Sequence, residues 1–239
     1  MTAVLIVCAA VFGLVIGSFL NVVAYRVPAH IPLSCESRCP RCGAPIRWYQ
    51  NVPVVSWLAL RGRCASCRTP IPVRYPVVEA ITGAAFVVVA WWILTTGAAG
   101  VSSHGGARSV SGTFADPVFW IVLVAYLYFA AISIVLTLID VDVHRLPNGI
   151  VLPAYPVAGI LLLLACAVGA PWANLLRAGI AMAALYVFYF VIRLISPRGM
   201  GGGDVKLAGV VGIYLGWAGW SSLAVGAFAA FALGGLFGL

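Results

Sequence analysis

The sequence predicts an all-α polytopic membrane protein with about seven transmembrane helices and a cytoplasmic zinc-binding loop after the first helix. Hydrophobic residues make up 63% of the chain and charged residues only 8%, whereas a typical soluble domain has about 25% charged residues. Apolar runs near the roughly 20 residues that cross a bilayer recur along the whole length. Eight of the 14 basic residues fall in one polar segment after the first run, an asymmetry typical of a cytoplasmic loop.

The apolar runs define the expected spans. Residues 2–25 have neither a basic n-region nor an A-x-A cleavage site, which predicts an uncleaved membrane helix rather than a signal peptide. The stretch from Thr96 to Gly112 is rich in Gly and Ser and is predicted to be a flexible external loop. Further spans are expected at residues 78–97, 117–139, 149–169, 174–195, 206–218 and 220–239.

Charge predicts the organisation and the orientation of the chain. We divide it into a first transmembrane helix (1–25), a cytoplasmic four-cysteine loop (26–76) and a transmembrane domain (77–239). Because Lys and Arg collect in cytoplasmic loops, the arginines of residues 26–76 predict that this loop lies inside and the N-terminus outside. The formal charge of +8 could suggest nucleic acid, but its clustering in one loop favours contact with anionic lipid headgroups. No nucleic-acid partner is expected.

Four cysteines of the polar loop form two C-x-x-C pairs, Cys39 with Cys42 and Cys64 with Cys67, with 21 residues between the pairs. Four thiolates complete the closed tetrahedral shell of a structural zinc ion, which leaves no open position for catalysis. The metal would hold together a loop that has little apolar core of its own. Two disulfides or four free thiols are the alternatives, and a reducing cytosol disfavours disulfides. Cys35 precedes the first pair and could be a spare ligand, but we interpret it as a free surface thiol.

The chain has only six acidic residues, and an ionisable group at membrane depth is costly enough to indicate function. Asp140 ends one apolar run and Asp204 precedes another, both at the predicted cytoplasmic boundary. Two carboxylates that meet at one water share a proton, because like charges in contact cannot both ionise. One can then activate the water while the other protonates a peptide carbonyl, which predicts an aspartic peptidase. Gly201 and Gly203 would let an extended peptide approach closely.

Several of these acids have a structural alternative. Asp140 and Asp204 could be helix caps, a role that suits Asp204 before a helix better than Asp140 after one. Asp142 is the rival to Asp140, but it points to a different face if the helix continues. Glu79 either pairs with Arg74 or lies near a ligand.

The supporting residues and the function class also have alternatives. Lys206 either extends to lipid headgroups or biases the charge of Asp204. Together with Gly201, Gly203 and Glu79 it is a candidate for supporting substrate binding. A zinc-loop adaptor without chemistry and a proton-coupled transporter are the rival functions. The glycines at the second acid favour a peptidase, and the lack of acids deep within any span argues against a proton relay.

Seven motifs occur in order between residue 13 and about residue 215: GSFLNVV at 17–23, CPRCG at 39–43, NVP at 51–53, RGRCASC at 61–67, RYPVVE at 74–79, Ile139-Asp140 with LPN at 146–148, and GMGGGDVKL at 199–207. Together they resemble the bacterial type IV prepilin peptidases. The resemblance implies that Asp140 and Asp204 are the catalytic pair.

The resemblance further implies an enzyme of the bacterial inner membrane that removes the leaders of type IV prepilins and pseudopilins at the cytoplasmic face. Many members then methylate the new N-terminal amine with S-adenosylmethionine, and the cysteine loop is typical of that bifunctional class. Methylation rests on the resemblance alone, because the sequence has no glycine-rich nucleotide-binding fingerprint. Family members usually continue through one more helix after the region of 220–239, whereas this sequence stops at Leu239. The oligomeric state is not predicted.

Overall fold

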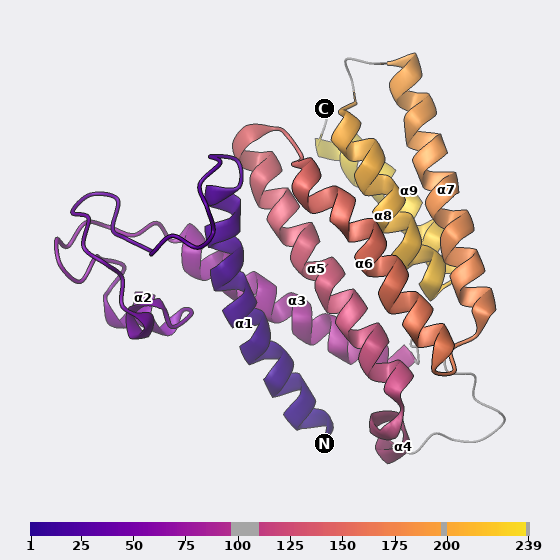
Figure 1. Cartoon of the computed structure of the whole chain (residues 1–239), viewed down its shortest axis with the longest axis horizontal. Helices are drawn as coiled ribbons and strands as arrows, with labels where there is room; N and C mark the ends of the chain where they lie inside the picture. Colours follow the sequence, from indigo (N-terminus) through magenta and orange to yellow (C-terminus); the bar gives the residue numbers. More distant parts are fainter. Residues whose placement is uncertain (97–109, 197–199, 238–239) are drawn as a thin grey trace. The chain divides into compact units, whose positions relative to one another are not determined.

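The computed structural model describes residues 1–96, 110–196 and 200–237, with the side chains of 110–112 and 231–237 excepted. Figure 1 shows the helices in chain order. They are α1 (Thr2–Arg26), the 3-10 helix η1 (Trp48–Asn51), α2 (Val55–Ala59), α3 (Arg74–Thr96), α4 (Val110–Ala115), α5 (Pro117–Val143), α6 (Asn148–Ala167), α7 (Trp172–Ile195), α8 (Gly202–Ala218) and α9 (Trp220–Phe237).

The described part of the chain contains helices and no strand, which confirms the predicted all-α class. Its only β-type pairings are two isolated bridges in the polar loop, between Arg38 and Pro45 and between Arg63 and Pro70. The predicted external loop falls mostly on residues 97–109, which lie outside the described residues.

Five helices are long and apolar enough to cross a membrane: α1, α3, α5, α6 and α7, with 20 to 27 residues each. They correspond to five of the predicted spans. The other two predicted spans are also helical, but α8 has only 17 residues, and the described apolar part of α9 runs from Trp220 to Ala230. The count of seven spans therefore stays a prediction.

Several helix ends differ from the expected bounds, among them the two that carry Asp140 and Asp204. α5 runs to Val143, past the predicted end at residue 139, and α8 begins at Gly202, before the predicted start at 206. In α8 the early start has a local cause, since the carboxylate of Asp204 accepts a hydrogen bond from the Gly201 N–H and closes the first turn. Asp204 therefore lies inside a helix rather than before it.

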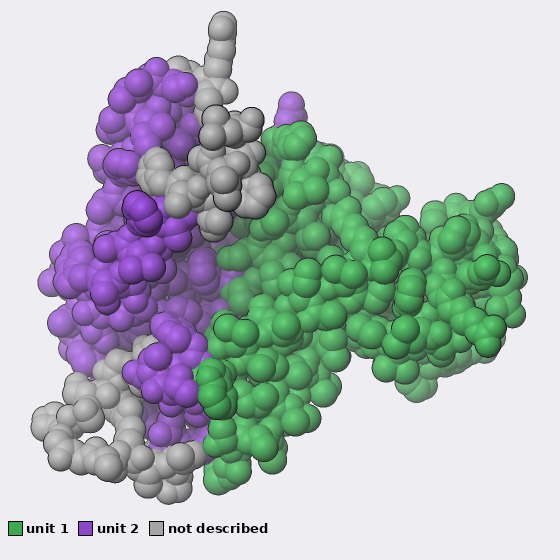
Figure 2. Space-filling model, turned by 180° about the vertical axis from the view of Figure 1, so that it is seen from behind, with its two compact units in different colours: residues 1–91, 130–144 green, residues 92–129, 145–239 purple. Residues whose placement is uncertain are grey.

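The chain divides into two compact units, which Figure 2 colours separately. Unit 1 comprises residues 1–91 and 130–144, and unit 2 comprises residues 92–129 and 145–239. The polar loop and the second half of α5 belong to unit 1. The glycine-rich motif at the start of α8 belongs to unit 2.

In unit 1, α1 and α3 approach each other closely through glycines. A Cβ atom on Gly13 would lie 2.8 Å from the Cα of Gly83, and one on Gly17 would lie 2.7 Å from the Cα of Glu79. Small residues four apart are a common way for membrane helices to bring their backbones together. The contact fixes Glu79 beside α1.

In unit 2, α8 is the most buried helix and packs against α6 and α7 (Figure 1). Gly212 and Gly216 allow this contact, because a Cβ atom on either would lie within 2.6 Å of Ala181 on α7. Arg177 donates to the carbonyls of Gly216 and Trp217, two acceptors that the end of α8 leaves without helical partners. The N-terminal end of α8, which carries Asp204, is thus part of a well-packed helix.

Candidate active site and metal centre

The first cysteine pair lies in a tight turn held by backbone hydrogen bonds. The N–H of Cys39 donates to the carbonyl of Ala44 at 2.9 Å, and the N–H of Gly43 donates back to the carbonyl of Cys39 at 2.9 Å. Gly43 has a φ of +70°, a left-handed conformation that glycine adopts without steric cost. The turn points the thiols of Cys39 and Cys42 toward one metal position.

The second pair repeats this turn. The N–H of Cys64 donates to the carbonyl of Thr69 at 2.8 Å, and the N–H of Arg68 donates to the carbonyl of Cys64 at 3.1 Å. Arg68 occupies the place of Gly43, with a φ of +58°. A side chain in this conformation carries a steric cost of about 1–2 kcal/mol, so the second turn is strained where the first is not.

The four sulfur atoms of Cys39, Cys42, Cys64 and Cys67 lie within 4.8 Å of one another. The Sγ atoms of Cys39 and Cys67 are 3.8 Å apart, too far for a disulfide bond of about 2.05 Å. Zn–S bonds of about 2.3 Å in a tetrahedron place neighbouring sulfurs about 3.8 Å apart. All seven cysteines are free, so the alternative of two disulfides is wrong. The cluster fits a metal ion such as zinc.

Electrostatics within the cluster also favour a cation. Hydrogen bonds from the side chain and backbone of Thr69 lower the pKa of Cys67 to about 6. The backbone N–H groups of Cys42 and Arg41 lower the pKa of Cys39. The N–H of Ala44 acts in the same direction on Cys42, but desolvation and the neighbouring thiols outweigh it and raise that pKa to about 11. Thiolates so close together need a positive ion to coexist.

Apart from the metal cluster, the polar loop has little interior. Between residues 27 and 73 only Cys39, Ser56 and Gly62 are buried, and Trp48 is 83% exposed. A segment that buries so little apolar surface would gain much of its folding free energy from a metal ion bound at the cysteine cluster.

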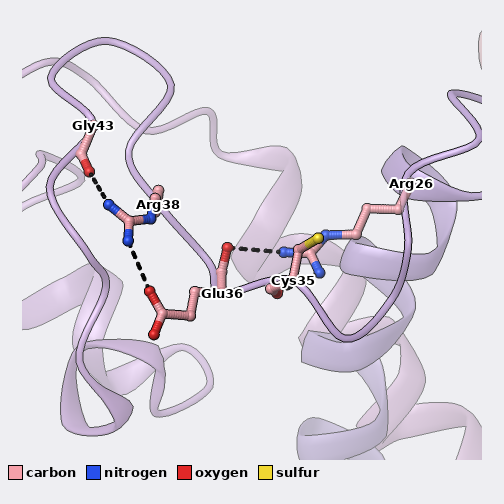
Figure 3. A network of polar contacts seen from close by, with 5 residues as sticks. All are labelled: Arg26, Cys35, Glu36, Arg38 and Gly43. Carbon is pink, nitrogen blue, oxygen red and sulfur yellow. Dashed lines mark hydrogen bonds and ion pairs between the residues drawn. The ribbon is translucent and has the colours of Figure 1, made fainter.

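The loop is held to α1 and to α3 at two points. Arg26, the last residue of α1, donates to four backbone carbonyls between residues 32 and 36, at 2.6 to 3.4 Å. Figure 3 shows part of this contact and its continuation, in which Glu36 pairs with Arg38 at 2.9 Å. In the middle of the loop, the Val54 N–H donates a hydrogen bond at 2.7 Å to Glu79 of α3, which is buried.

Glu79 therefore does not pair with Arg74, one of its two predicted environments. The two residues are five apart on α3 and so lie on different sides of the helix. Arg74 instead forms a bidentate ion pair with Asp142, at 2.7 and 2.6 Å. The observed role of Glu79 is to hold the polar loop.

Asp140 lies in the last turn of α5, and its side chain is exposed. Because α5 continues to Val143, Asp140 and Asp142 point to different faces. The carboxylate of Asp142 is engaged by Arg74, whereas that of Asp140 has no hydrogen-bond or ion-pair partner among the described residues. Of the two acids, Asp140 is the one available for chemistry.

Asp204 lies in the first turn of α8 and is exposed. Its Oδ2 atom accepts the Gly201 N–H at 3.0 Å, so part of the capping alternative is correct. The same residue lines a cavity of about 210 Å³ between α7, α8 and α9. The remaining lining is mostly apolar and includes Leu185, Tyr189, Leu207, Val211 and Leu215.

The glycines beside Asp204 are places of close packing. A Cβ atom on Gly203 would lie 2.7 Å from the Cβ of Leu146, and one on Gly201 would lie 2.9 Å from the carboxylate of Asp204. The groups that approach these glycines are therefore parts of the chain itself. Their predicted role in admitting a peptide stays a prediction.

Lys206 connects the glycine-rich motif to the start of α6. Its Nζ donates to Oδ1 of Asn148 at 2.9 Å, and its backbone carbonyl accepts the hydroxyl of Tyr155. It forms no ion pair within the described ranges. Sequence reasoning named Asn148 only as part of the LPN motif at 146–148, without a contact, and did not single out Tyr155.

Asp140 belongs to unit 1 and Asp204 to unit 2. Their pairing stays a prediction.

Comparison with known proteins gives consistent matches over both halves of the chain. Residues 11–93 match the family described as the Bacterial Peptidase A24 N-terminal domain, and residues 127–239 match the Type IV leader peptidase family. The first range contains the cysteine cluster, and the second contains Asp140 and Asp204. No solved structure matches the chain.

Several relatives carry the name prepilin leader peptidase/N-methyltransferase, among them the following three. The protein of Neisseria gonorrhoeae is 36% identical over 87% of this chain and 73% of its own length. That of Pseudomonas putida is 34% identical over 99% of this chain and 81% of its own length. That of Klebsiella pneumoniae is 35% identical over 86% of this chain and 82% of its own length.

Proposed function

The chain belongs to the type IV leader peptidase family, and from this membership we propose that it removes the leader peptides of type IV prepilins and pseudopilins, with Asp140 and Asp204 as its catalytic pair. The observation that carries the proposal is the match of residues 127–239, because this segment holds both acids. The same segment gives the enzyme class, an aspartic endopeptidase of the membrane.

The proposed chemistry needs one proton shared between two carboxylates. The ionised member takes a proton from water as the water attacks the scissile carbonyl, and the protonated member donates to the carbonyl oxygen. The roles exchange as the amine leaves. The carboxylate that activates the water must not be engaged by another group. Asp140 has no hydrogen-bond or ion-pair partner among the described residues.

Two features support a role for Asp204 beside Asp140. Only six positions separate Asp140 from Leu146 along the chain, and Leu146 packs against Gly203, the neighbour of Asp204. The apolar cavity that Asp204 lines suits an apolar segment of a membrane-bound substrate.

We further propose that the four cysteines bind a structural zinc ion and that the loop lies in the cytoplasm, with the N-terminus outside the inner membrane. Zinc would stabilise the two turns and would take no part in hydrolysis, because four thiolates leave no open position. Glu79, Gly201, Gly203 and Lys206 would then keep the loop and the helix ends in place around the substrate.

Methylation of the new N-terminal amine is the proposed second step, as the relatives' shared name suggests. S-adenosylmethionine would supply the methyl group. The cavity at Asp204 is mostly apolar and does not suit this polar cofactor. We derive no step through the cofactor.

The proposal is tested by incubating the purified full-length chain with a prepilin in detergent and measuring the substrate by mass spectrometry. The expected product lacks its leader, and it gains one methyl group only when S-adenosylmethionine is added. A zinc-loop adaptor or a transporter would leave the prepilin uncut.

A further inference from the structure

A second cavity, of about 340 Å³, lies within unit 1 between α1 and the polar loop. Its α1 side is formed by Val15, Ser18, Phe19, Val22 and Arg26. These residues are three or four apart and so form one continuous stripe. At 1.5 Å per residue the stripe is about 16 Å long.

The stripe changes from apolar to cationic along its length. Val15 and Phe19 are each about half exposed, at 51% and 50%, although they are large apolar side chains. Arg26, at the other end, is only 8% exposed. The loop side adds polar groups near Arg26, among them Ser37 and Asn51. A ligand that fills this cavity has an apolar part and a polar part.

The buried charge of Arg26 lacks a counter-ion. Its hydrogen bonds all go to neutral backbone carbonyls between residues 32 and 36. No described residue accepts a hydrogen bond from its Nε or forms an ion pair with it. The one acid nearby in sequence, Glu36, is paired with Arg38 instead. A buried guanidinium without an acid is costly, and a phosphate matches its geometry with two parallel hydrogen bonds.

We propose that this cavity binds one anionic phospholipid, with the phosphate at Arg26 and an acyl chain along Val15, Phe19 and Val22. The surrounding charge supports the choice, since residues 26–76 carry eight arginines and the single acid Glu36. Such a basic segment next to a membrane helix attracts anionic lipids. The apolar stripe favours a phospholipid over free phosphate.

The first test measures lipid binding to the delipidated full-length chain by native mass spectrometry. Phosphatidylglycerol and phosphatidylcholine with identical acyl chains are compared, and inorganic phosphate is added as competitor. Both lipids carry the phosphate, but the quaternary ammonium of phosphatidylcholine cancels its net charge and is repelled by the arginines of the loop. We therefore expect phosphatidylglycerol to bind at least about tenfold more tightly. Equal binding of the two lipids would overturn the proposal. Displacement of phosphatidylglycerol by millimolar phosphate would identify the site as one for free anions.

The second test changes the charge of the cavity without touching α1. Asn51→Asp is isosteric and places a carboxylate in the same lining as Arg26, so it should weaken phosphatidylglycerol binding about tenfold. Arg63→Gln is the matched control, because Arg63 is exposed and does not line the cavity, and it should keep parental binding. Arg26→Gln would also release the loop carbonyls, so Asn51→Asp is the decisive change. Parental affinity in Asn51→Asp would refute the site.

Discussion

Arg74 and Asp142 form a bidentate ion pair, with guanidinium nitrogens 2.7 Å from Oδ1 and 2.6 Å from Oδ2. The same guanidinium lies 3.5 Å from the carbonyl of Leu138. The pair joins the start of α3 to the last turn of α5 within unit 1. It also occupies Asp142, the acid nearest in sequence to Asp140, whereas the carboxylate of Asp140 has no such partner among the described residues.

Removing the ion pair should have a small effect on stability and on cleavage. We expect Asp142→Asn to lower the free energy of unfolding by no more than about 1 kcal/mol, because both partners are partly exposed and solvent screens the pair. Arg74→Gln should behave in the same way. Thermal unfolding in detergent and prepilin cleavage rates measure the two effects. Loss of cleavage in Asp142→Asn, with unfolding unchanged, would make Asp142 a catalytic acid.

Zinc should depend on the four clustered cysteines and on no other cysteine. We expect about one zinc per chain by elemental analysis, loss of most of it in Cys67→Ser, and full retention in Cys35→Ser, since Cys35 lies outside the cluster. A chelator should expose the thiols to alkylation as the loop unfolds. A protein that keeps its zinc in Cys67→Ser would contradict the assigned ligands.

The two cysteine turns predict opposite effects of exchanging Gly and Arg. Arg68→Gly should stabilise the loop by up to about 1 kcal/mol, because it removes a side chain from a left-handed conformation. Gly43→Ala should destabilise it by about 1–2 kcal/mol for the same reason, since no atom lies near the added Cβ.

The effects of Arg68→Gly and Gly43→Ala on loop stability are measured by the rate at which zinc is transferred to a chelator. Gly149→Ala is the control, because its added Cβ also meets no atom and its φ is not positive. Equal rates of zinc release from Arg68→Gly and the parent would show that the left-handed conformation of Arg68 does not destabilise the loop.

Packing at the start of α8 should be sensitive to a single methyl group. The Cβ of Gly203→Ala would lie 2.7 Å from the Cβ of Leu146, so the turn that carries Asp204 must move. We expect a destabilisation of about 1–3 kcal/mol together with a loss of cleavage. Gly179→Ala on α7 is the control, because no atom lies within 4 Å of its added Cβ atom. It should keep the parental stability and the parental cleavage rate. Unfolding curves and cleavage rates separate displacement of Asp204 from general unfolding.

Composition and spacing predicted the all-α class, five of the spans and the cysteine cluster. These features follow from local patterns, namely apolar runs of bilayer length and the C-x-x-C spacing. The ends of α5 and α8 were placed several residues short because they depend on contacts of Asp142 and Asp204 with other residues. The partner of Arg74 could not be predicted either, since Asp142 is 68 residues away in sequence.

The candidate site was predictable as a set of residue types but not as a set of contacts. Asp140 and Asp204 stand out because acids are rare in this chain. The packing of Leu146 on Gly203 and the hydrogen bond from Lys206 to Asn148 join segments more than 50 residues apart, which no periodicity reveals.

The central claim is that Asp140 and Asp204 act as one catalytic pair. It is tested most directly by single-turnover cleavage of a prepilin by the parent chain, Asp140→Asn, Asp204→Asn and the matched control Asp142→Asn, each verified as folded by its zinc content and thermal unfolding. The account predicts that either amide at 140 or 204 lowers the cleavage rate by at least about a thousandfold, because each acid is needed for proton transfer, whereas Asp142→Asn stays near the parent. Near-parental cleavage by Asp140→Asn or Asp204→Asn would contradict it.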